Sequence, residues 1–557
     1  MKIELNKSSI VQFMAICLFF LSSTKLYAQN GHITYFQKIS IDSLKKHTLI
    51  LSSDKFAGRG TGQHGGDLAA NYIAKRLEKY DIKPIAPHDN YFQFVPMHAS
   101  ITSSASNLKI FLSDTVIDLQ YASDYVLYKL GQQTFIPKPL PLVFVGYGIS
   151  APEYDYNDYQ SVDVSGKIAV FLDGEPTSND SNYFEGPNPS IYSYAESKQR
   201  IAMAKGASGS IMIPLCCSNY YKSWNDHIRQ FLFEDVQLAY SVSKNLSLMM
   251  RPEIARILFR NSEYKLEDVD KMVASHRMTS FPLRSQLSFK GVFQEREFYS
   301  PNVIGLIQGK KSSPNDEYII ISAHYDHLGI GPPVKGDSIY NGMSDNAIGV
   351  AALLEITRVL SQQSFEPNYS ILLLFMTGEE KGLLGSTHYI DNPVVPLYKT
   401  IANINIDGIA MFDTFEDVVG VGSEYSTLHK FLEKVCKQVG LYVSPMPYNF
   451  ISSESFARSD QITFAKAGIP SILIAEGYHY HNISTEEGLN KMIDWAQNIY
   501  HSPFDEPISN INYYAVNQHV NLLYLFCESL AMSDFKPEWK SGAPFINARL
   551  RSLRQKY

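Results

Sequence analysis

Short apolar runs alternate with helix-like segments between residues 300 and 535, and this alternation constrains the fold more than any other feature. The apolar runs indicate buried strands at Val303–Gln308, Tyr318–Ala323, Ser370–Thr377, Thr400–Ile406 and Pro470–Ala475. The segments between them indicate helices at Ala347–Ser361, Gly382–Ile390, Thr427–Val439 and Ser459–Ala467. Such alternation is typical of an α/β domain. We therefore expect a mixed, mostly parallel central sheet flanked by helices.

The segment from about 105 to 290 has a different pattern. Short apolar runs at Leu142–Gly148 and Lys167–Leu172 predict strands, and Ser197–Lys205 predicts a helix. The segment holds no cluster of the residue types that carry catalysis. We therefore expect it to form an accessory domain.

A glycine-rich stretch, Gly58–Gly66, separates two segments, 41–57 and 67–83, that we expect to be helical. Three of its glycines fit the GxGxxG spacing of dinucleotide-binding loops. That motif requires a preceding strand, whereas the segment before Gly58 is helix-like. The stretch is better interpreted as a loop that leads into a helix.

The first residues are typical of an export signal. Lys2 and Lys7 precede an apolar run, Ile10–Leu21, which is too short to span a bilayer as a mature helix. We expect cleavage near Ala28. No later stretch approaches 18 apolar residues, so we expect no membrane span after signal removal and a periplasmic or extracellular location. The net charge of −7 over 557 residues argues against a nucleic-acid partner.

The number and spacing of the cysteines argue against a disulfide scaffold and against a zinc site built from thiolates. Besides Cys17 in the signal, the chain has only Cys216, Cys217, Cys436 and Cys527, too few for a disulfide scaffold. No CxxC spacing is present, which disfavours a thiolate zinc site. Any metal must therefore be held by histidines and carboxylates.

Histidines and carboxylates follow several predicted strands directly. They are His324, Asp326 and His327 after the second strand, Glu379 and Glu380 after the third, and Asp407 after the fourth. Asp345 opens a helix, and His501 and Asp505 lie near the end of the domain. Taken singly, each has an ordinary structural explanation, such as a helix N-cap for Asp345. Because ligand sites in open α/β sheets lie at the carboxyl ends of strands, we expect these side chains to meet.

This set of side chains suits a two-metal hydrolase. Zn²⁺ accepts histidine nitrogen and carboxylate oxygen, and two such ions about 3.5–4 Å apart need a bridging group. A further carboxylate that binds no metal is needed to take the proton of the attacking water. The adjacent pair Glu379 and Glu380 supplies one residue for each task.

At these residues the chain resembles the leucine aminopeptidase/aminopeptidase Y family of co-catalytic di-zinc exopeptidases. Glutamate carboxypeptidase, glutaminyl cyclase and the transferrin receptor are more distant relatives. The matching motifs are Ser322–Gly329, Asn341–Gly349, Phe375–Ser386, Asn405–Asp407 and Tyr500–Asp505. The resemblance implies the phosphorylase/hydrolase-like zinc exopeptidase fold, two Zn²⁺ per chain and peptide substrates. Segment 140–215 looks like the β-rich protease-associated domain that is often inserted in this family.

The resemblance also implies a role for each residue. His324, Asp345 and Asp407 would hold one zinc, and Asp345, Glu380 and His501 would hold the other, with Asp345 bridging. Glu379 would be the general base that activates the bridging water. Asp326 would orient the imidazole of His324, and Tyr500 matches a tyrosine that in some members donates to the oxyanion. His327 is not expected to bind metal, and Asp505 is expected to support the loop of His501.

Together these observations divide the chain into five parts. We expect a signal peptide at 1–28, the first part of the peptidase domain at 29–104 and the inserted protease-associated domain at 105–290. The di-zinc catalytic domain would span 291–535, followed by a C-terminal tail at 536–557.

The chain departs from the family pattern at Gln461, where many relatives have histidine, and at Phe504, where many have serine. We expect both near the substrate, where they would affect specificity. His479 and His481 also look like a metal pair, but the implied five-ligand set is complete without them, and a loop over the mouth of the site is preferred.

The leading hypothesis is an exported aminopeptidase. A carboxypeptidase or dipeptidase of the glutamate carboxypeptidase type would grip a C-terminal carboxylate with arginines. Few arginines follow residue 300, although Arg59 keeps this alternative open. A glutaminyl cyclase would use one zinc, which the five-ligand set disfavours. A non-catalytic binding protein on the same fold would have lost metal ligands, and none is lost here.

Overall fold

The fold is known from a computed structural model. It describes residues 38–85, 89–128, 135–180, 182–184, 186, 190–214, 223–241, 245–310, 316–362, 366–446, 456–507 and 511–556. The proposed signal peptide, Cys17, Cys216 and Cys217 lie outside these residues. Cys436 and Cys527 are free and buried. In the described part of the chain, no helix has both the length and the hydropathy needed to cross a membrane.

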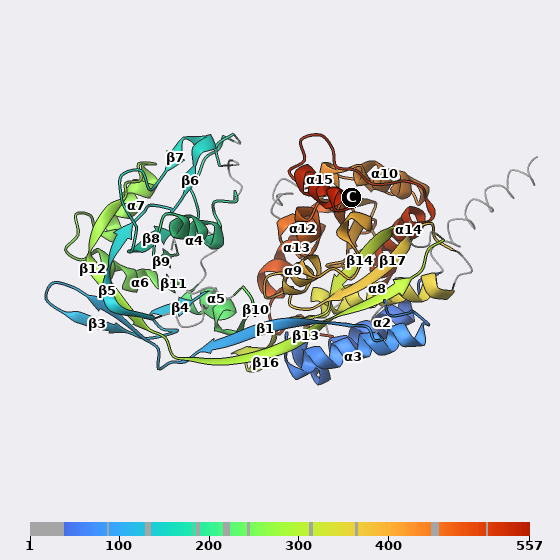
Figure 1. The fold of residues 1–557 in the computed structure, drawn as a ribbon, viewed down its shortest axis with the longest axis horizontal. Coiled ribbons are helices and arrows are strands. Elements are labelled where there is room, and N and C mark those ends of the chain that lie inside the picture. Colours follow the sequence, from blue (N-terminus) through green and yellow to red (C-terminus); the bar gives the residue numbers. More distant parts are fainter. Residues whose placement is uncertain are drawn as a thin grey trace, which may run out of the picture.

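Two large sheets organise the chain into two lobes (Figure 1). The main sheet has the order β10 (Asp235–Leu238), β1 (Phe92–Thr102), β13 (Phe293–Ile307), β17 (Ser370–Met376), β14 (Tyr318–His324), β18 (Thr400–Asn405), β21 (Ser471–Glu476), β19 (Asp417–Val421) and β20 (Tyr442–Val443). Parallel pairing joins β17, β14, β18 and β21, and also β19 and β20, whereas the remaining pairs are antiparallel. The sheet is therefore mixed, and less dominated by parallel pairs than the sequence predicts.

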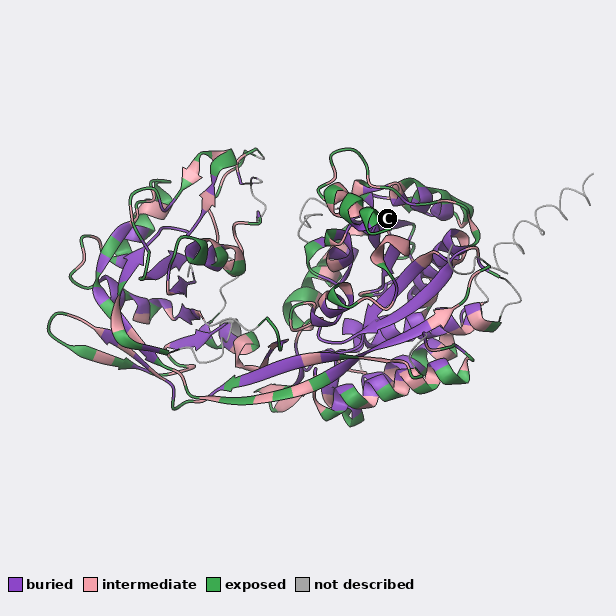
Figure 2. Cartoon of the chain, viewed as in Figure 1, coloured by how far each residue is buried: buried purple, intermediate pink, exposed green. Residues whose placement is uncertain are grey.

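The central strands are buried on both faces, so their residues alternate between two hydrophobic cores. In β17, Ile371, Leu373 and Phe375 belong to the larger core, while Leu372 and Leu374 face the other side. The larger core is covered by α2 (Ile41–Leu51), α3 (His64–Lys79), α8 (Ile348–Gln362), α10 (Leu428–Gln438) and α14 (Tyr513–Met532). The opposite face packs against α9 (Leu384–Asp391) and α12 (Gln461–Lys466). Figure 2 shows these central strands as buried.

The second sheet lies within residues 107–290 and has helices of its own. Its order is β3 (Val116–Leu119), β2 (Asn107–Phe111), β12 (Phe281–Lys290), β5 (Phe135–Phe144), β8 (Ile168–Leu172), β9 (Gly209–Ile213), β11 (Leu246–Met250) and β4 (Tyr125–Leu127). The helices are α4 (Ala195–Ala204), α5 (Trp224–Ile228), α6 (Pro252–Ala255) and α7 (Leu266–Ala274). This segment also contributes β10 to the main sheet, where it pairs with β1.

Long strands connect the two lobes (Figure 1). β1 and β13 pair along their length in antiparallel register from Phe92–Val303 to Thr102–Phe293. The sequence pattern predicts only the last part of β13, from Val303. The chain therefore enters the second lobe along β1 and leaves it along β13, and β10 pairs with β1 in the same ribbon.

Smaller elements complete the main lobe. The hairpin of β15 (Gly329–Val334) and β16 (Asp337–Tyr340) follows His327, and η1 (Asp54–Arg59) precedes α3. Within the glycine-rich stretch, η1 takes in residues 58 and 59 and α3 begins at His64, so only residues 60–63 form the loop that the sequence predicts. Residues after 535 are more than a tail: α15 (Ile546–Arg554) forms there, and Trp539 Nε1 donates to Gly468 O at 2.9 Å. Helix α13 (Thr485–Asn498) precedes His501 in the chain.

Candidate metal centre

Three neighbouring parallel strands deliver histidine and carboxylate side chains to one edge of the main sheet. β14 ends at His324, Glu379 and Glu380 follow β17, and Asp407 follows β18. The register sets His324 beside Met376 of β17. Because the carboxyl ends of parallel strands share an edge, the residues that follow them converge. Their convergence is confirmed.

One group of side chains that could hold a metal consists of His324, Asp345 and Asp407. His324 Nε2 lies 3.2 Å from Asp345 Oδ1 and 3.2 Å from Asp407 Oδ1. Two ligands on a tetrahedral zinc ion lie about 3.4 Å apart, given bonds of about 2.1 Å. The spacing of these atoms therefore fits a shared ion.

The orientation of His324 fits the same role. Its Nδ1 lies 3.1 Å from the backbone carbonyl oxygen of Asp326, which can only accept a hydrogen bond. Nδ1 therefore carries a hydrogen, which leaves Nε2, the nitrogen beside the two carboxylates, as the one that can bind a metal. Without a metal, Asp407 outweighs the effect of burial and raises the pKa of His324 well above its usual value, so Nε2 donates to the carboxylate of Asp407. The Asp326 carboxylate is farther away, with Oδ1 at 3.8 Å from Nδ1. The contact that orients the imidazole is thus made by the backbone of Asp326 and not by its carboxylate.

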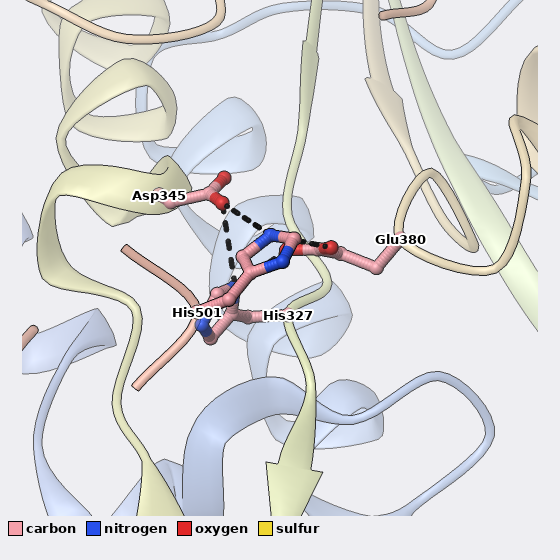
Figure 3. Close-up of side chains that lie close together, drawn as sticks. All are labelled: His327, Asp345, Glu380 and His501. Carbon is pink, nitrogen blue, oxygen red and sulfur yellow. Dashed lines mark hydrogen bonds and ion pairs between the residues drawn. The ribbon is translucent and has the colours of Figure 1, made fainter. Parts of the chain in front are cut away.

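A second group consists of His327, Asp345, Glu380 and His501 (Figure 3). His501 Nε2 lies 3.2 Å from Asp345 Oδ2 and 3.1 Å from Glu380 Oε2. The two distances meet the limit for ion pairs, yet among the described residues this nitrogen has no partner in hydrogen-bond geometry. A ring nitrogen placed between two carboxylate oxygens suits a site that all three could share with a cation. Asp345 belongs to both groups, with one oxygen toward each.

His327 lies inside the second group, although the sequence leads us to expect no metal role for it. Its Nδ1 is 2.6 Å from Glu380 Oε1 and 3.8 Å from Asp345 Oδ2. The first distance is that of a charge-assisted hydrogen bond and is shorter than the spacing of two ligands on one ion. The geometry therefore supports His327 as a donor that holds Glu380. Its position three residues after His324 was the only sequence signal for this contact.

Without a metal, the charges in the second group shift the pKa values of His501 and Glu380 in opposite directions. Burial alone would lower the pKa of His501, but the carboxylates of Glu380 and Asp345 outweigh it and raise that pKa to about 10. Burial would raise the pKa of Glu380, but His501 and His327 outweigh it and lower that pKa to about 2. A proton on His501 thus takes the position that a cation would otherwise occupy.

Glu379 belongs to neither metal-capable group. Its backbone N–H donates to Asp326 Oδ1 at 3.1 Å, and the other oxygen of Asp326 accepts from Thr61 Oγ1 at 2.8 Å. Burial raises the pKa of the Glu379 carboxyl well above its usual value, and the nearby carboxylates of Asp407 and Glu380 add to this rise, while His324 opposes it. A raised pKa is typical of a residue that exchanges protons near neutral pH.

Asp505 supports the loop of Asp345 rather than only that of His501. Its carboxylate accepts from the backbone N–H of Ser344 at 2.9 Å and of Asp345 at 3.1 Å. The hydroxyl of Ser344 donates to it at 2.8 Å. The segments around residues 345 and 501 are therefore fastened to each other.

Tyr500 is at the surface of the site, with 39% of its area exposed. Its ring stacks on His501 with 3.8 Å between centroids and lies 5.1 Å from Trp495. Neither metal-capable group includes it.

Other positions singled out in the sequence lie elsewhere. Gln461 is fully buried, and its Oε1 accepts from Asn405 Nδ2 at 2.8 Å. Gln461 thus belongs to a buried polar network with Asn405, two residues before Asp407, and its place near the substrate stays a prediction. His479 pairs with Asp417 at 2.8 Å, and neither it nor His481 belongs to a metal-capable group among the described residues. Phe504 is partly buried beneath the ammonium of Lys335, 5.1 Å from the ring centre.

Comparisons with known proteins agree with this geometry. Residues 302–526 match the model of peptidase family M28. Aminopeptidase YwaD of Bacillus subtilis is 28% identical over 179 residues, which cover 31% of this chain and 34% of that protein. A probable glutamate carboxypeptidase of Zea mays, VP8, is 31% identical over 119 residues, or 20% of this chain and 15% of that protein. The chain thus spans about a third or less of the length of these two curated relatives.

The fold likeness extends over nearly the whole chain. The structure of an aminopeptidase from Aneurinibacillus sp. strain AM-1 superposes with a TM-score of 0.54 at 18% identity, covering 91% of this chain and 97% of that one. At this identity the likeness shows the fold alone. Both metal-capable groups lie within the segment that the family model matches. The part of the chain that holds both metal-capable groups, residues 302–526, is therefore similar to peptidase family M28.

Proposed function

We propose that this protein is an exported, zinc-dependent exopeptidase that removes N-terminal residues from peptides. The observation that carries the proposal is the convergence of two metal-capable groups on one shared carboxylate, that of Asp345. The match of residues 302–526 to the model of peptidase family M28 and the name of the relative YwaD, an aminopeptidase, support the reaction class. The proposed periplasmic or extracellular location rests on the first 28 residues alone.

Two zinc ions would fit the residues present. His324, Asp345 and Asp407 would hold one, and Asp345, Glu380 and His501 would hold the other. The position of His324 Nε2 and of His501 Nε2 between carboxylate oxygens supports this assignment, as do ligand spacings of 3.1–3.2 Å. When bound, two such ions would polarise the scissile carbonyl and acidify the attacking water.

Glu379 would move the proton. As a carboxylate it accepts the proton of the attacking water, and as the acid it returns that proton to the leaving amine. The hydrogen bond from the backbone N–H of Glu379 to Asp326 fixes the position of the Glu379 backbone, from which its side chain extends into the site. Bound cations would lower the pKa of Glu379 from its raised value in the metal-free site, toward the range in which a base works.

Tyr500 would donate its phenol hydrogen to the oxyanion of the tetrahedral state. Its exposed position beside His501 supports contact with substrate. The stacked imidazole restricts the ring to one orientation, which is what a preorganised donor requires.

The environment of Arg59 favours an aminopeptidase over a carboxypeptidase. A carboxypeptidase would need an accessible guanidinium to bind the substrate's terminal carboxylate. Arg59 is fully buried and donates to backbone carbonyls on all sides. It cannot reach a peptide in the site.

The direct test is digestion of a peptide library with a mass readout. We expect successive loss of residues from the free N-terminus, and no cleavage of peptides whose α-amine is acetylated. Loss from the C-terminus, with acetylated peptides cleaved as well as free ones, would support the carboxypeptidase alternative. Absence of any cleavage by protein with its full metal content would favour a binding protein on the same fold.

Metal stoichiometry tests the ligand assignment. We expect close to two zinc ions per chain, falling to about one in His501→Ala, because that variant loses a direct ligand of one ion. His327→Gln is the matched variant: glutamine can still donate a hydrogen bond to Glu380, so zinc content should stay near two. Elemental analysis after dialysis measures both. Equal loss of zinc in the two variants would make His327 a ligand.

A further inference from the structure

Arg59 is a fully buried cation that contacts both loops of the metal centre. Its side chain is 0% exposed. All of its nitrogens donate to backbone carbonyl oxygens. The contacts are Nε to Tyr325 O (2.8 Å), Nη1 to Leu51 O (3.0 Å) and Asn341 O (2.6 Å), and Nη2 to Gly342 O (2.7 Å) and Asp345 O (3.3 Å). Four of these five carbonyls belong to the segments that carry His324 and Asp345.

This pattern differs from that of a buried salt bridge. In the described part of the chain, Arg59 has no carboxylate within ion-pair distance. Burial lowers the pKa of Arg59 to about 10, while the more distant carboxylates of Asp345, Asp505 and Asp326 oppose that shift. The guanidinium thus stays charged at neutral pH. Its planar fork is suited to holding several acceptors in fixed directions.

Asp505 holds the same loop through the opposite kind of group. Arg59 binds the carbonyl oxygens of Asn341, Gly342 and Asp345, whereas Asp505 accepts from the N–H groups of Ser344 and Asp345. The backbone of residues 341–345 is therefore held from both sides. Each side uses a charged group, which makes the hydrogen bonds stronger than neutral ones.

The backbone on both sides of this contact is closely packed. Gly58 precedes Arg59 with φ +66°, and a Cβ there would lie 2.3 Å from Tyr340 O. Gly342 has φ +58°, and a Cβ there would lie 2.3 Å from Asp345 O and 2.4 Å from the ring of His327. The backbone oxygen of Arg59 also accepts from the N–H of His327 at 3.3 Å. The loops that accept hydrogen bonds from the Arg59 side chain therefore also pack against the backbone around Arg59 and fix its position.

We propose that Arg59 is a positioning residue that, together with Asp505, fixes the backbone of residues 341–345 and thereby places the Asp345 carboxylate between the two metal-capable groups. The inference rests on the proposed function in one respect: Asp345 is taken to bridge two metal ions. It assigns no contact between Arg59 and substrate. Its consequence is that metal affinity depends on a side chain that touches no ligand atom.

Arg59→Lys is the central variant. Lysine keeps the charge, but a single ammonium cannot reach five carbonyls that surround a planar fork. We expect zinc affinity to fall by a factor of about 10–100, the effect typical of residues that orient ligands from outside. Competition with a chromophoric chelator, in the absence of peptide, measures this. Electron paramagnetic resonance of the dicobalt form should also show altered coupling between the ions.

Arg549→Lys is the matched control. Arg549 likewise donates to backbone carbonyls, Leu397 O at 3.5 Å and Thr400 O at 2.9 Å, but Thr400 begins β18 and is remote from Asp407 at its other end. We expect Arg549→Lys to lower the unfolding temperature without changing zinc affinity or cobalt coupling. Unchanged zinc affinity in Arg59→Lys, with a lowered unfolding temperature alone, would overturn the proposal.

Asp505→Asn keeps the proposal testable if Arg59→Lys does not fold. Both carboxylate oxygens of Asp505 accept hydrogen bonds, and in asparagine an NH2 group replaces one of them and faces a donor, so the loop should be held less firmly. We expect the same fall in zinc affinity, and an Asp505→Asn protein with normal zinc affinity would contradict the proposal. Wild-type protein that binds two zinc ions but cleaves no peptide would refute the proposed function and leave this inference standing.

Discussion

Replacing Glu379 by glutamine is expected to reduce kcat by a factor on the order of 10²–10⁴, the contribution typical of a general acid–base residue. Glutamine matches the size of the side chain but cannot accept the proton of the attacking water. The backbone N–H of residue 379 still donates to Asp326, so the local structure should be kept. Steady-state kinetics on a peptide identified by the library digestion measures the change.

Two controls separate this effect from loss of metal or of fold. Because Glu379 belongs to neither metal-capable group, its variant should retain two zinc ions, and a loss of zinc would make Glu379 a ligand. Glu424→Gln changes an exposed glutamate and should leave kcat unaltered. If Glu379 titrates as the base, the acidic limb of the kcat–pH profile should also disappear in Glu379→Gln. A variant with full turnover would refute the assigned role.

The sequence predicts the centre of the main sheet well because each central strand is an apolar run buried on both faces. The predicted strand at Tyr318–Ala323 becomes Tyr318–His324, and that at Ser370–Thr377 becomes Ser370–Met376. Once these strands are known, their parallel order brings His324, Glu380 and Asp407 together. The metal-capable groups could therefore be predicted from strand ends and motif spacing.

The supporting contacts could not be predicted in the same way. Arg59 and Asn341 are 282 positions apart, and nothing local in either segment indicates that they meet. Gln461 stands in a segment that resembles a substrate-facing motif, yet its amide is buried against Asn405. Such contacts depend on how loops pack across the sheet edge, which apolar periodicity does not record. Most of the ribbon of β1 and β13 is not apparent from the sequence for a related reason, because polar residues interrupt its apolar ones and leave no continuous apolar run before Val303.

Removing zinc is the change with the largest expected effect. Chelation should abolish turnover, because neither Glu379 nor any other residue of the site can replace the charge that two cations supply. Addition of two equivalents of zinc should restore it. Zinc should also stabilise the fold: a free concentration 100-fold above Kd adds about 2.7 kcal/mol to the free energy of unfolding at one site. A chelated protein that contains no zinc and still cleaves peptides would overturn the mechanism.

Zinc binding by the metal-free protein should depend on pH, and the pKa of His501 sets the direction of that dependence. In the metal-free protein the pKa of His501 is raised from 6.5 to about 10, so its contribution to folding stability is full below pH 6.5 and is lost as pH rises through about 10. Zinc must displace that proton, since only the neutral imidazole is a ligand. Zinc uptake near pH 7 should therefore release a proton from this site, and zinc affinity should rise with pH. Calorimetry in buffers of different ionisation enthalpy measures the release. His501→Ala should reduce this proton release, because the carboxylates around His324 also raise the pKa of that proposed ligand. His327→Gln should leave the release unchanged, because His327 is not a proposed ligand.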